Sequence, residues 1–161
     1  MSNNRWFWFL LFVAVSYAVA ALGSLFTASS VNTWYAHLQK PSINPPNWIF
    51  GPVWSTLYLL MAVSAWLVWR SAGWTDGRAA LTLFFVQLGL NLLWSAVFFG
   101  LRQPGLALLE IMFLLASIIA TAVAYFPLSR LAFWLMLPYV TWVSFACVLN
   151  FKIWQLNRGV A

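Results

Sequence analysis

Apolar residues fill this chain in five long runs, which are separated by charged residues, prolines and glycines. We expect these runs to be helices over about residues 6–26, 48–69, 79–100, 105–126 and 130–154. Each run has about 20 or more residues, and at about 1.5 Å per residue such a helix crosses the roughly 30 Å hydrocarbon core of a bilayer. Helices satisfy their own backbone hydrogen bonds in lipid, and the alternation typical of barrel strands is missing. The pattern predicts an all-α bundle of five transmembrane helices in a single domain, residues 1–161.

The connections between the runs differ in length. Three are short, and they lie around residue 75, at 102–104 and at 127–129. Short connections make consecutive helices antiparallel neighbours. The connection over residues 27–47 is long, and long loops in compact domains are usually functional. Because the backbone before each of its prolines is held extended, we expect this loop to be ordered.

The composition is typical of a membrane protein, and it affects how the net positive charge is interpreted. The chain is 64% hydrophobic and 6% charged, whereas soluble domains have about 25% charged residues. Eight Lys and Arg against two acids give a net charge of +6, but the basic residues are single and fall mostly between apolar runs. Residues in such places anchor helix ends at the membrane boundary, and they form no patch for nucleic acid. We therefore expect a lipid bilayer as partner and no nucleic acid.

The first apolar run resembles a signal peptide because a charge precedes it. It is too long for one and lacks a clean cleavage site before a hydrophilic domain, so we interpret it as a retained helix. An odd number of spans then places the two termini on opposite sides of the membrane. The Lys and Arg residues divide equally between the two faces, so the positive-inside rule assigns no orientation.

Residues with conventional catalytic chemistry are few. One cysteine, Cys147, and one histidine, His37, leave no internal disulfide and no zinc site. Glu110, about one turn into the fourth run, is interpreted as structural, and Asp76, in a loop, as solvated. No Ser/His/Asp set, Cys/His pair or carboxylate pair can be assembled at membrane depth. The sequence therefore shows no machinery for hydrolysis or acid–base catalysis, and no metal site.

A polar stripe lies on the third predicted helix. Gln87, Asn91 and Ser95 are spaced i, i+4, i+8, which places them on one helical face. Such a stripe either joins helices by hydrogen bonds, at about 1 kcal/mol per contact, or lines a cavity that holds a polar group or a ligand. The spacing alone leaves both interpretations open.

Aromatic residues at helical spacing lie deep in three of the predicted helices. Trp54 and Tyr58 share a face of the second helix, Trp94 borders the polar stripe, and Trp142 and Ala146 share a face of the fifth. Tryptophan belts at membrane interfaces do not explain residues at this depth. The faces either pack against one another or line one pocket suited to a flat, apolar ligand.

The run WYAHLQKPSINPPNWIFGPVWSTLY resembles the signature of the TspO/MBR family of tryptophan-rich sensory proteins, translocator proteins and peripheral-type benzodiazepine receptors. The matching residues are Trp34, Tyr35, Leu38, Lys40, Pro41, Pro45, Pro46, Phe50, Trp54, Leu57 and Tyr58. Two later segments match as well, through Asn91, Trp94, Ser95, Phe98 and Phe99, and through Pro138, Tyr139, Trp142, Phe145, Ala146, Leu149 and Asn150. The resemblance covers nearly the whole chain.

This resemblance implies a homodimeric membrane protein with a pocket beneath the first loop. The implied ligands are tetrapyrroles, such as protoporphyrin IX or a haem-type tetrapyrrole, and drug-like aromatic molecules, with no cofactor required. The implied role is that of a sensor, regulator or carrier. The terse loops look bacterial, so we expect a bacterial membrane. The implied ligand-binding residues are Tyr35, Pro45, Trp54, Tyr58, Asn91, Trp94, Ser95, Trp142 and Ala146.

Two other functions remain open. The resemblance also implies an enzyme that degrades porphyrin in light and oxygen, with Trp54 and Trp142 as catalytic residues that donate an electron or trap a radical. A small transporter or a scaffold is the third hypothesis. Charges that could couple transport to ion flow are nearly missing from the spans, whereas small residues such as those at 116, 120 and 124 could support close helix packing.

Specific cholesterol binding is not expected. The segment VLNFKIWQLN corresponds to the family's C-terminal sterol pattern, but Phe151 stands in the place of its tyrosine and Gln155 in the place of its basic residue. Even the intact pattern is weak.

Overall fold

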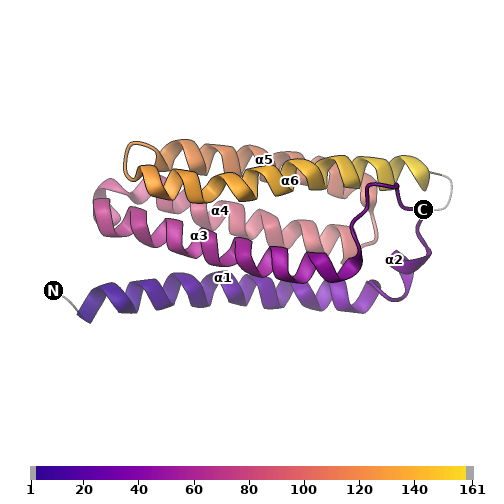
Figure 1. The fold of residues 1–161 in the computed structure, drawn as a ribbon, viewed down its shortest axis with the longest axis horizontal. Coiled ribbons are helices and arrows are strands. Elements are labelled where there is room, and N and C mark those ends of the chain that lie inside the picture. Colours follow the sequence, from indigo (N-terminus) through magenta and orange to yellow (C-terminus); the bar gives the residue numbers. More distant parts are fainter. Residues whose placement is uncertain (1–2, 159–161) are drawn as a thin grey trace.

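A computed structural model describes residues 3–158, and all regular structure within that range is helical. The elements are α1 (Asn3–Ser30), α2 (Trp34–His37), α3 (Asn47–Asp76), α4 (Arg78–Ser95), the π-helical turn η1 (Ala96–Gly100), α5 (Pro104–Tyr125) and α6 (Arg130–Leu156) (Figure 1). In this part of the chain, five helices are long and apolar enough to span a membrane, with η1 continuing α4 in one of them. The predicted all-α fold with five spans is confirmed.

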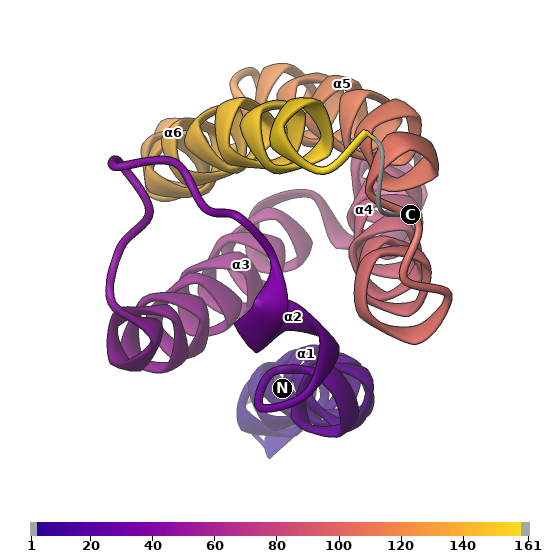
Figure 2. The same cartoon turned by 90° about the vertical axis from the view of Figure 1, so that its right-hand side faces the viewer.

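The long helices form a ring in which each packs against two neighbours (Figure 2). The order around the ring is α1, α3, α6, α5 and α4, and α3 also contacts α4 across the interior. Residues 31–46, which include α2, cross one end of the bundle, and we call them the lid. The helix α1 begins at the end opposite to that at which α6 ends (Figure 1). This geometry follows from an odd number of antiparallel spans.

The helix α1 is longer than the expected span of 6–26, and the expected loop 27–47 is correspondingly shorter. Hydroxyl groups explain the difference. Thr27 Oγ1 donates a hydrogen bond to the Gly23 carbonyl at 3.3 Å, and Ser29 Oγ donates to the Phe26 carbonyl at 2.7 Å. Polar side chains that bond back to their own helix do not have to end it. The long, ordered first connection is present, but it contains one helical turn, α2.

The helix α3 also passes its expected end at residue 69 and takes in most of the loop expected near residue 75. Its backbone leaves helical geometry at Gly73, where φ is +65° and ψ is −164°. Glycine adopts a positive φ at little steric cost, so the chain bends there and returns to helix. Gly77 alone separates α3 from α4.

The interior is solid at the end of the bundle away from the lid. Phe12, Met61, Phe84 and Met136 come from four helices, and each has at most 2% of its surface exposed. Phe12 meets Phe84 edge-on, with ring centroids 5.6 Å apart. Rings in this arrangement attract each other beyond their burial alone. This half of the bundle therefore holds the helices in register.

Candidate functional site: a cavity beneath the lid

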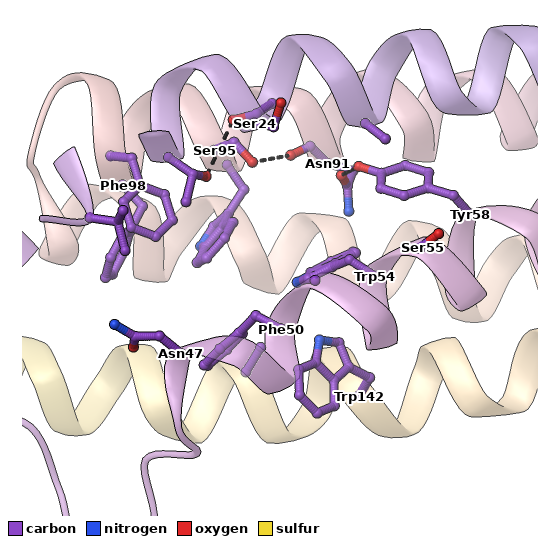
Figure 3. Close-up of a pocket in the computed structure, with 18 of the residues that line it drawn as sticks. Ser24, Asn47, Phe50, Trp54, Ser55, Tyr58, Asn91, Ser95, Phe98 and Trp142 are labelled. Carbon is purple, nitrogen blue, oxygen red and sulfur yellow. Dashed lines mark hydrogen bonds between the residues drawn. The ribbon is translucent and has the colours of Figure 1, made fainter. Parts of the chain in front are cut away.

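A cavity of about 520 Å³ lies in the half of the bundle beneath the lid (Figure 3). Its walls come from α1, α2, α3, α4, η1 and α6, which are distant in sequence. Pockets that enclose drug-sized molecules have volumes of roughly 300–1,000 Å³. The cavity is therefore large enough for a ligand of that class.

Most of the predicted ligand-binding residues lie around this cavity. Its walls include Tyr35, Trp54, Tyr58, Asn91, Trp94, Ser95, Trp142 and Ala146. Pro45 is not among the lining residues, and its carbonyl instead accepts a hydrogen bond from Asn44 Nδ2 at 3.0 Å within the lid. Residues chosen by helical spacing and by family resemblance are thus brought together from four elements, α2, α3, α4 and α6, with one lid residue left outside the wall.

Two predicted tryptophans belong to the aromatic wall. Trp54 packs at 5.8 Å from the ring of Tyr58 on the same helix. Trp142 on α6 meets Phe50 on α3 edge-on at 5.8 Å. Figure 3 shows Trp54, Phe50 and Trp142 grouped around one space. The Nε1 atom of Trp142 is buried under neighbouring atoms and has no hydrogen-bond partner within residues 3–158.

The ring of Trp94 is fixed on both its face and its edge. It stacks on Phe98 with a centroid separation of 5.1 Å and an interplanar angle of 25°. Its Nε1 donates to Asn150 Oδ1 at 3.1 Å, and Asn150 Nδ2 donates to the Pro104 carbonyl at 2.7 Å. The chain of contacts connects α4 to α6 and to the first residue of α5. Asn150 was part of the family match but not of the predicted site.

Asn91 is the centre of a buried hydrogen-bond network. The Tyr58 hydroxyl donates to Asn91 Oδ1, and Asn91 Nδ2 donates to the Tyr139 hydroxyl at 3.0 Å. The three residues come from α3, α4 and α6, and each is at most 6% exposed. Asn91 therefore joins three helices and also lines the cavity, so both interpretations of the polar stripe apply to it.

The other two members of the stripe differ from Asn91. Ser95 lines the cavity and donates a long hydrogen bond of 3.5 Å to the Asn91 carbonyl. Gln87 is fully buried outside the cavity wall, and neither of its side-chain polar atoms has a partner within the described residues. Helical spacing grouped the three residues, but only two of them reach the cavity.

The lid is organised around Tyr35. Its hydroxyl donates to Asn44 Oδ1 at 3.1 Å, and its ring is 6% exposed. Burial raises the pKa of the Tyr35 phenol, and the hydrogen bond to Asn44 lowers it by less. The phenol therefore stays neutral at physiological pH and remains a donor. Lys40 Nζ lies 4.7 Å from the centroid of the same ring and donates to the carbonyls of Ala36 and Leu38 at 3.3 Å.

A second set of bonds fastens the lid to the end of α6. Asn157 Oδ1 accepts from the Gln39 backbone N–H at 3.0 Å, and Asn157 Nδ2 donates to the Gln39 carbonyl at 3.0 Å. One amide side chain thus satisfies both backbone groups of a lid residue. Asn157 is 6% exposed, so this pair is shielded from solvent.

The predicted site contained no residue from α1, yet α1 supplies part of the wall. Tyr17, Ala20, Gly23 and Ser24 line the cavity. Gly23 packs so closely on α4 that a Cβ atom there would lie 3.3 Å from Ser95 Oγ. The signal in the sequence was the change from large to small residues along this helix.

The reactive and charged residues that the sequence analysis did not assign to a site lie away from the cavity. Cys147, His37, Asp76 and Glu110 are not among the lining residues. The Glu110 carboxylate is buried and has no hydrogen-bond partner in the described part of the chain. Within residues 3–158, no three His, Cys, Asp or Glu side chains are grouped to hold a metal.

The sequence matches a known protein family along most of its length. The TspO/MBR family profile matches residues 12–155. The chain belongs to the TspO/MBR family. It is 46% identical over 140 residues to the tryptophan-rich protein TspO of Archaeoglobus fulgidus, which covers 87% of this chain and 90% of that protein. Together with its five apolar helices, family membership makes it a multi-pass membrane protein of the lipid bilayer.

Two further relatives show the breadth of the similarity. The translocator protein of Homo sapiens is 42% identical over 140 residues, or 86% of this chain and 83% of that protein. The tryptophan-rich sensory protein of Cereibacter sphaeroides is 38% identical over 155 residues, or 96% of this chain and 94% of that protein. In each case the similarity covers more than four fifths of both chains.

Proposed function

We propose that this protein binds a tetrapyrrole such as protoporphyrin IX beneath the lid and acts as a sensor, regulator or carrier of that ligand. The observation that carries the proposal is a cavity of about 520 Å³ with aromatic walls from α3, α4 and α6. A flat macrocycle gains favourable offset-stacked and edge-on contacts with such walls. Drug-like aromatic molecules fit by the same chemistry, and no additional cofactor is required.

The relatives' names support a sensing or carrying role. One is named a tryptophan-rich sensory protein and another a translocator protein. Both names concern proteins that share this chain's family. The spans contain few charged residues, which argues against ion-coupled transport because such transport needs titratable groups at membrane depth.

The unpartnered indole N–H of Trp142 supplies the polar part of recognition once its ring turns toward the bound ligand. It lies in the cavity wall without a partner in residues 3–158. A buried donor without a partner costs about 1–3 kcal/mol, so a ligand acceptor placed there gains affinity. A propionate carboxylate of a tetrapyrrole is such an acceptor.

The test is a titration of the purified protein with protoporphyrin IX, followed by tryptophan fluorescence. We expect saturable quenching, with the Kd raised about tenfold in Trp142→Phe, since one lost hydrogen bond to the ligand is worth about 1.4 kcal/mol. Asn91→Ala should raise the Kd as well, because the Asn91 amide holds Tyr58 in the cavity wall. Trp134→Phe is the matched control, because Trp134 is on the same helix, is 60% exposed and does not line the cavity. An unchanged Kd in both cavity variants would contradict the proposed site.

Porphyrin degradation in light and oxygen is the second candidate function. The observation that favours it is that Trp54 and Trp142 line the same cavity, within reach of one ligand. The illuminated protein should convert bound porphyrin to a distinct product in air and not under nitrogen. Equal conversion by the Trp54→Phe/Trp142→Phe double variant would remove the enzymatic reading and leave ligand binding intact.

We also propose that the protein is a homodimer in a bacterial membrane, with its termini on opposite faces. The family resemblance supports the dimer, and the position of the first and last helices supports the placement of the termini. Native mass spectrometry in lipid nanodiscs should give twice the mass of one chain. Protease treatment of sealed cells should remove a tag from one terminus only.

A further inference from the structure

The seam between α1 and α3 changes character along its length. Away from the lid it is closed by aromatic rings. The ring centroids of Trp8 and Trp69 are 5.3 Å apart, and Phe9 meets Trp66 edge-on with centroids 5.4 Å apart. Figure 1 shows the two helices running side by side. Large rings at this end leave no passage between the helices.

Nearer the lid the seam is built from small residues. Ala21 and Ser24 on α1, and Gly51 and Ser55 on α3, all line the cavity and are all exposed, as is Asn47 at the start of α3 next to the lid. Exposed cavity-lining residues on both sides of one seam indicate that the cavity reaches the outer surface there. Because α1 and α3 are membrane spans, that surface faces lipid.

One side chain separates the two parts of the seam. The Tyr17 hydroxyl donates to the Ser55 carbonyl at 2.9 Å and lies 3.3 Å from Ser55 Oγ. On the lid side of Tyr17, no hydrogen bond or aromatic pair joins α1 to α3 among the residues that the structure describes. Tyr17 also lines the cavity, so it stands at the edge of the opening.

The end of the cavity beneath the lid is closed much more firmly. Asn157 holds Gln39 by two hydrogen bonds of 3.0 Å, and Tyr35 holds Asn44 at 3.1 Å. A ligand that arrived from water through the lid would have to break several such bonds. A ligand that arrived through the seam would meet only the Tyr17 contact.

We infer that the ligand reaches the cavity sideways from the bilayer, through an opening between α1 and α3 that is bordered by Ala21, Ser24, Gly51 and Ser55 and gated by Tyr17. The inference rests on the proposed function and specifies its ligand class. The ligand is a flat, mostly apolar molecule that is dissolved in lipid before it binds. Such molecules leave water for the bilayer because apolar surface is poorly hydrated.

Gly51→Leu is the variant that closes the opening. A Cβ atom at Gly51 would have no neighbour within 4 Å, so a leucine fits the helix and fills the gap. Protoporphyrin IX is supplied in lipid vesicles to the protein in vesicles, and stopped-flow quenching gives both rates. We expect association and dissociation each to slow at least tenfold. A leucine that merely crowded the bound ligand would raise the dissociation rate instead.

Gly89→Leu is the matched control. Gly89 is an exposed glycine of α4, a Cβ atom there also has no neighbour within 4 Å, and it does not line the cavity. Both rates should equal those of the unchanged protein. Tyr17→Phe removes only the gating hydroxyl and should raise both rates several-fold, whereas Asn157→Ala loosens the lid and should change neither.

The outcomes separate the route from the proposed function. One possible result is saturable binding in which Asn157→Ala raises the association and dissociation rates and Gly51→Leu leaves both unchanged. This result would place the route through the lid. It would overturn the side opening but not the proposed function. Saturable binding with rates that no variant changes would overturn the side opening as well. No saturable binding by the unchanged protein would overturn the proposed function, and the route with it.

Discussion

Away from the lid, Phe12, Met61, Phe84 and Met136 fill the middle of the bundle and are at most 2% exposed, whereas beneath the lid a cavity of about 520 Å³ lies between the same helices. The helix α1 accounts for much of the difference. It presents Phe12 to the packed half and Ala20, Gly23 and Ser24 to the cavity. Small side chains at the wall leave volume that the rest of the ring does not fill.

The comparison also shows how a membrane protein keeps a cavity open. Lipid tails are as apolar as leucine, so no hydrophobic force drives the cavity walls together. The walls are held at fixed positions by the Asn91 network and by the bond from Trp94 to Asn150. Polar side chains at membrane depth thus maintain the shape of the site in the cavity half, and close packing of apolar side chains does so in the other half.

The largest effect is expected from a truncation in the packed half. Phe84→Ala should lower the free energy of unfolding by about 3 kcal/mol, because a phenylalanine lost from a core leaves a hole that its neighbours fill only in part. Circular dichroism during titration with SDS measures the change. The control is Phe113→Ala, which removes a ring that is 70% exposed and should cost little. Equal losses in the two variants would contradict the distinction between a solid half and a lipid-facing surface.

A smaller effect is expected from the polar network, and the polar stripe offers its own control. Asn91→Leu should cost about 1–2 kcal/mol, because the hydroxyls of Tyr58 and Tyr139 lose their partner in lipid. Gln87→Leu, one turn away, should be neutral or stabilising, because Gln87 has no hydrogen-bond partner within the described residues. The same SDS titration compares them. If Gln87→Leu costs as much as Asn91→Leu, both residues contribute by packing and not by hydrogen bonding.

A third change tests the close packing at the rim of the cavity half. In Gly105→Ala the new Cβ atom would lie 2.7 Å from Trp154 Nε1, and that ring is covered by the Arg158 guanidinium at 3.8 Å from its centroid. We expect a loss of about 1 kcal/mol from overpacking. Gly89→Ala has open space around it and should gain up to about 1 kcal/mol, since alanine is the better helix former. Melting temperatures in one detergent compare the two variants. Equal melting temperatures would mean that the Trp154 ring moves away from the new Cβ atom without cost.

The smallest effect is expected at the lid. Asn157→Ala removes both hydrogen bonds to Gln39 but leaves the spans intact, so global stability should fall by less than about 1 kcal/mol. Hydrogen exchange of the amides in residues 38–44 should become faster, because local opening no longer breaks these bonds. Exchange in α4 is the internal reference and should not change. Lid amides that exchange at their original rate would show that Tyr35 and Asn44 hold the lid alone.

Helical spacing was sufficient to identify the aromatic and polar faces of three helices. Trp54 and Tyr58, or Trp142 and Ala146, lie one turn apart, and a helix places such pairs on one side wherever it is packed. The family resemblance added Tyr35, which no periodicity indicates. Neither approach found Tyr17, because a single tyrosine in an apolar run carries no pattern.

The sequence by itself determined the membrane class, the number of spans and the faces that carry aromatic rings. Lipid requires every backbone polar group to be satisfied within its own helix, so long apolar runs leave no other structure. These properties depend on residues that are near each other in the chain.

Only the tertiary structure decided which faces meet and where the cavity opens. Leucine and phenylalanine are equally at home inside the bundle and against lipid, so hydropathy does not fix how each helix is rotated. The bonds from Asn157 to Gln39 and from Tyr17 to Ser55 join residues 118 and 38 positions apart. Such contacts exist only after the ring of helices has closed, and they determine both the fastened lid and the lightly held seam.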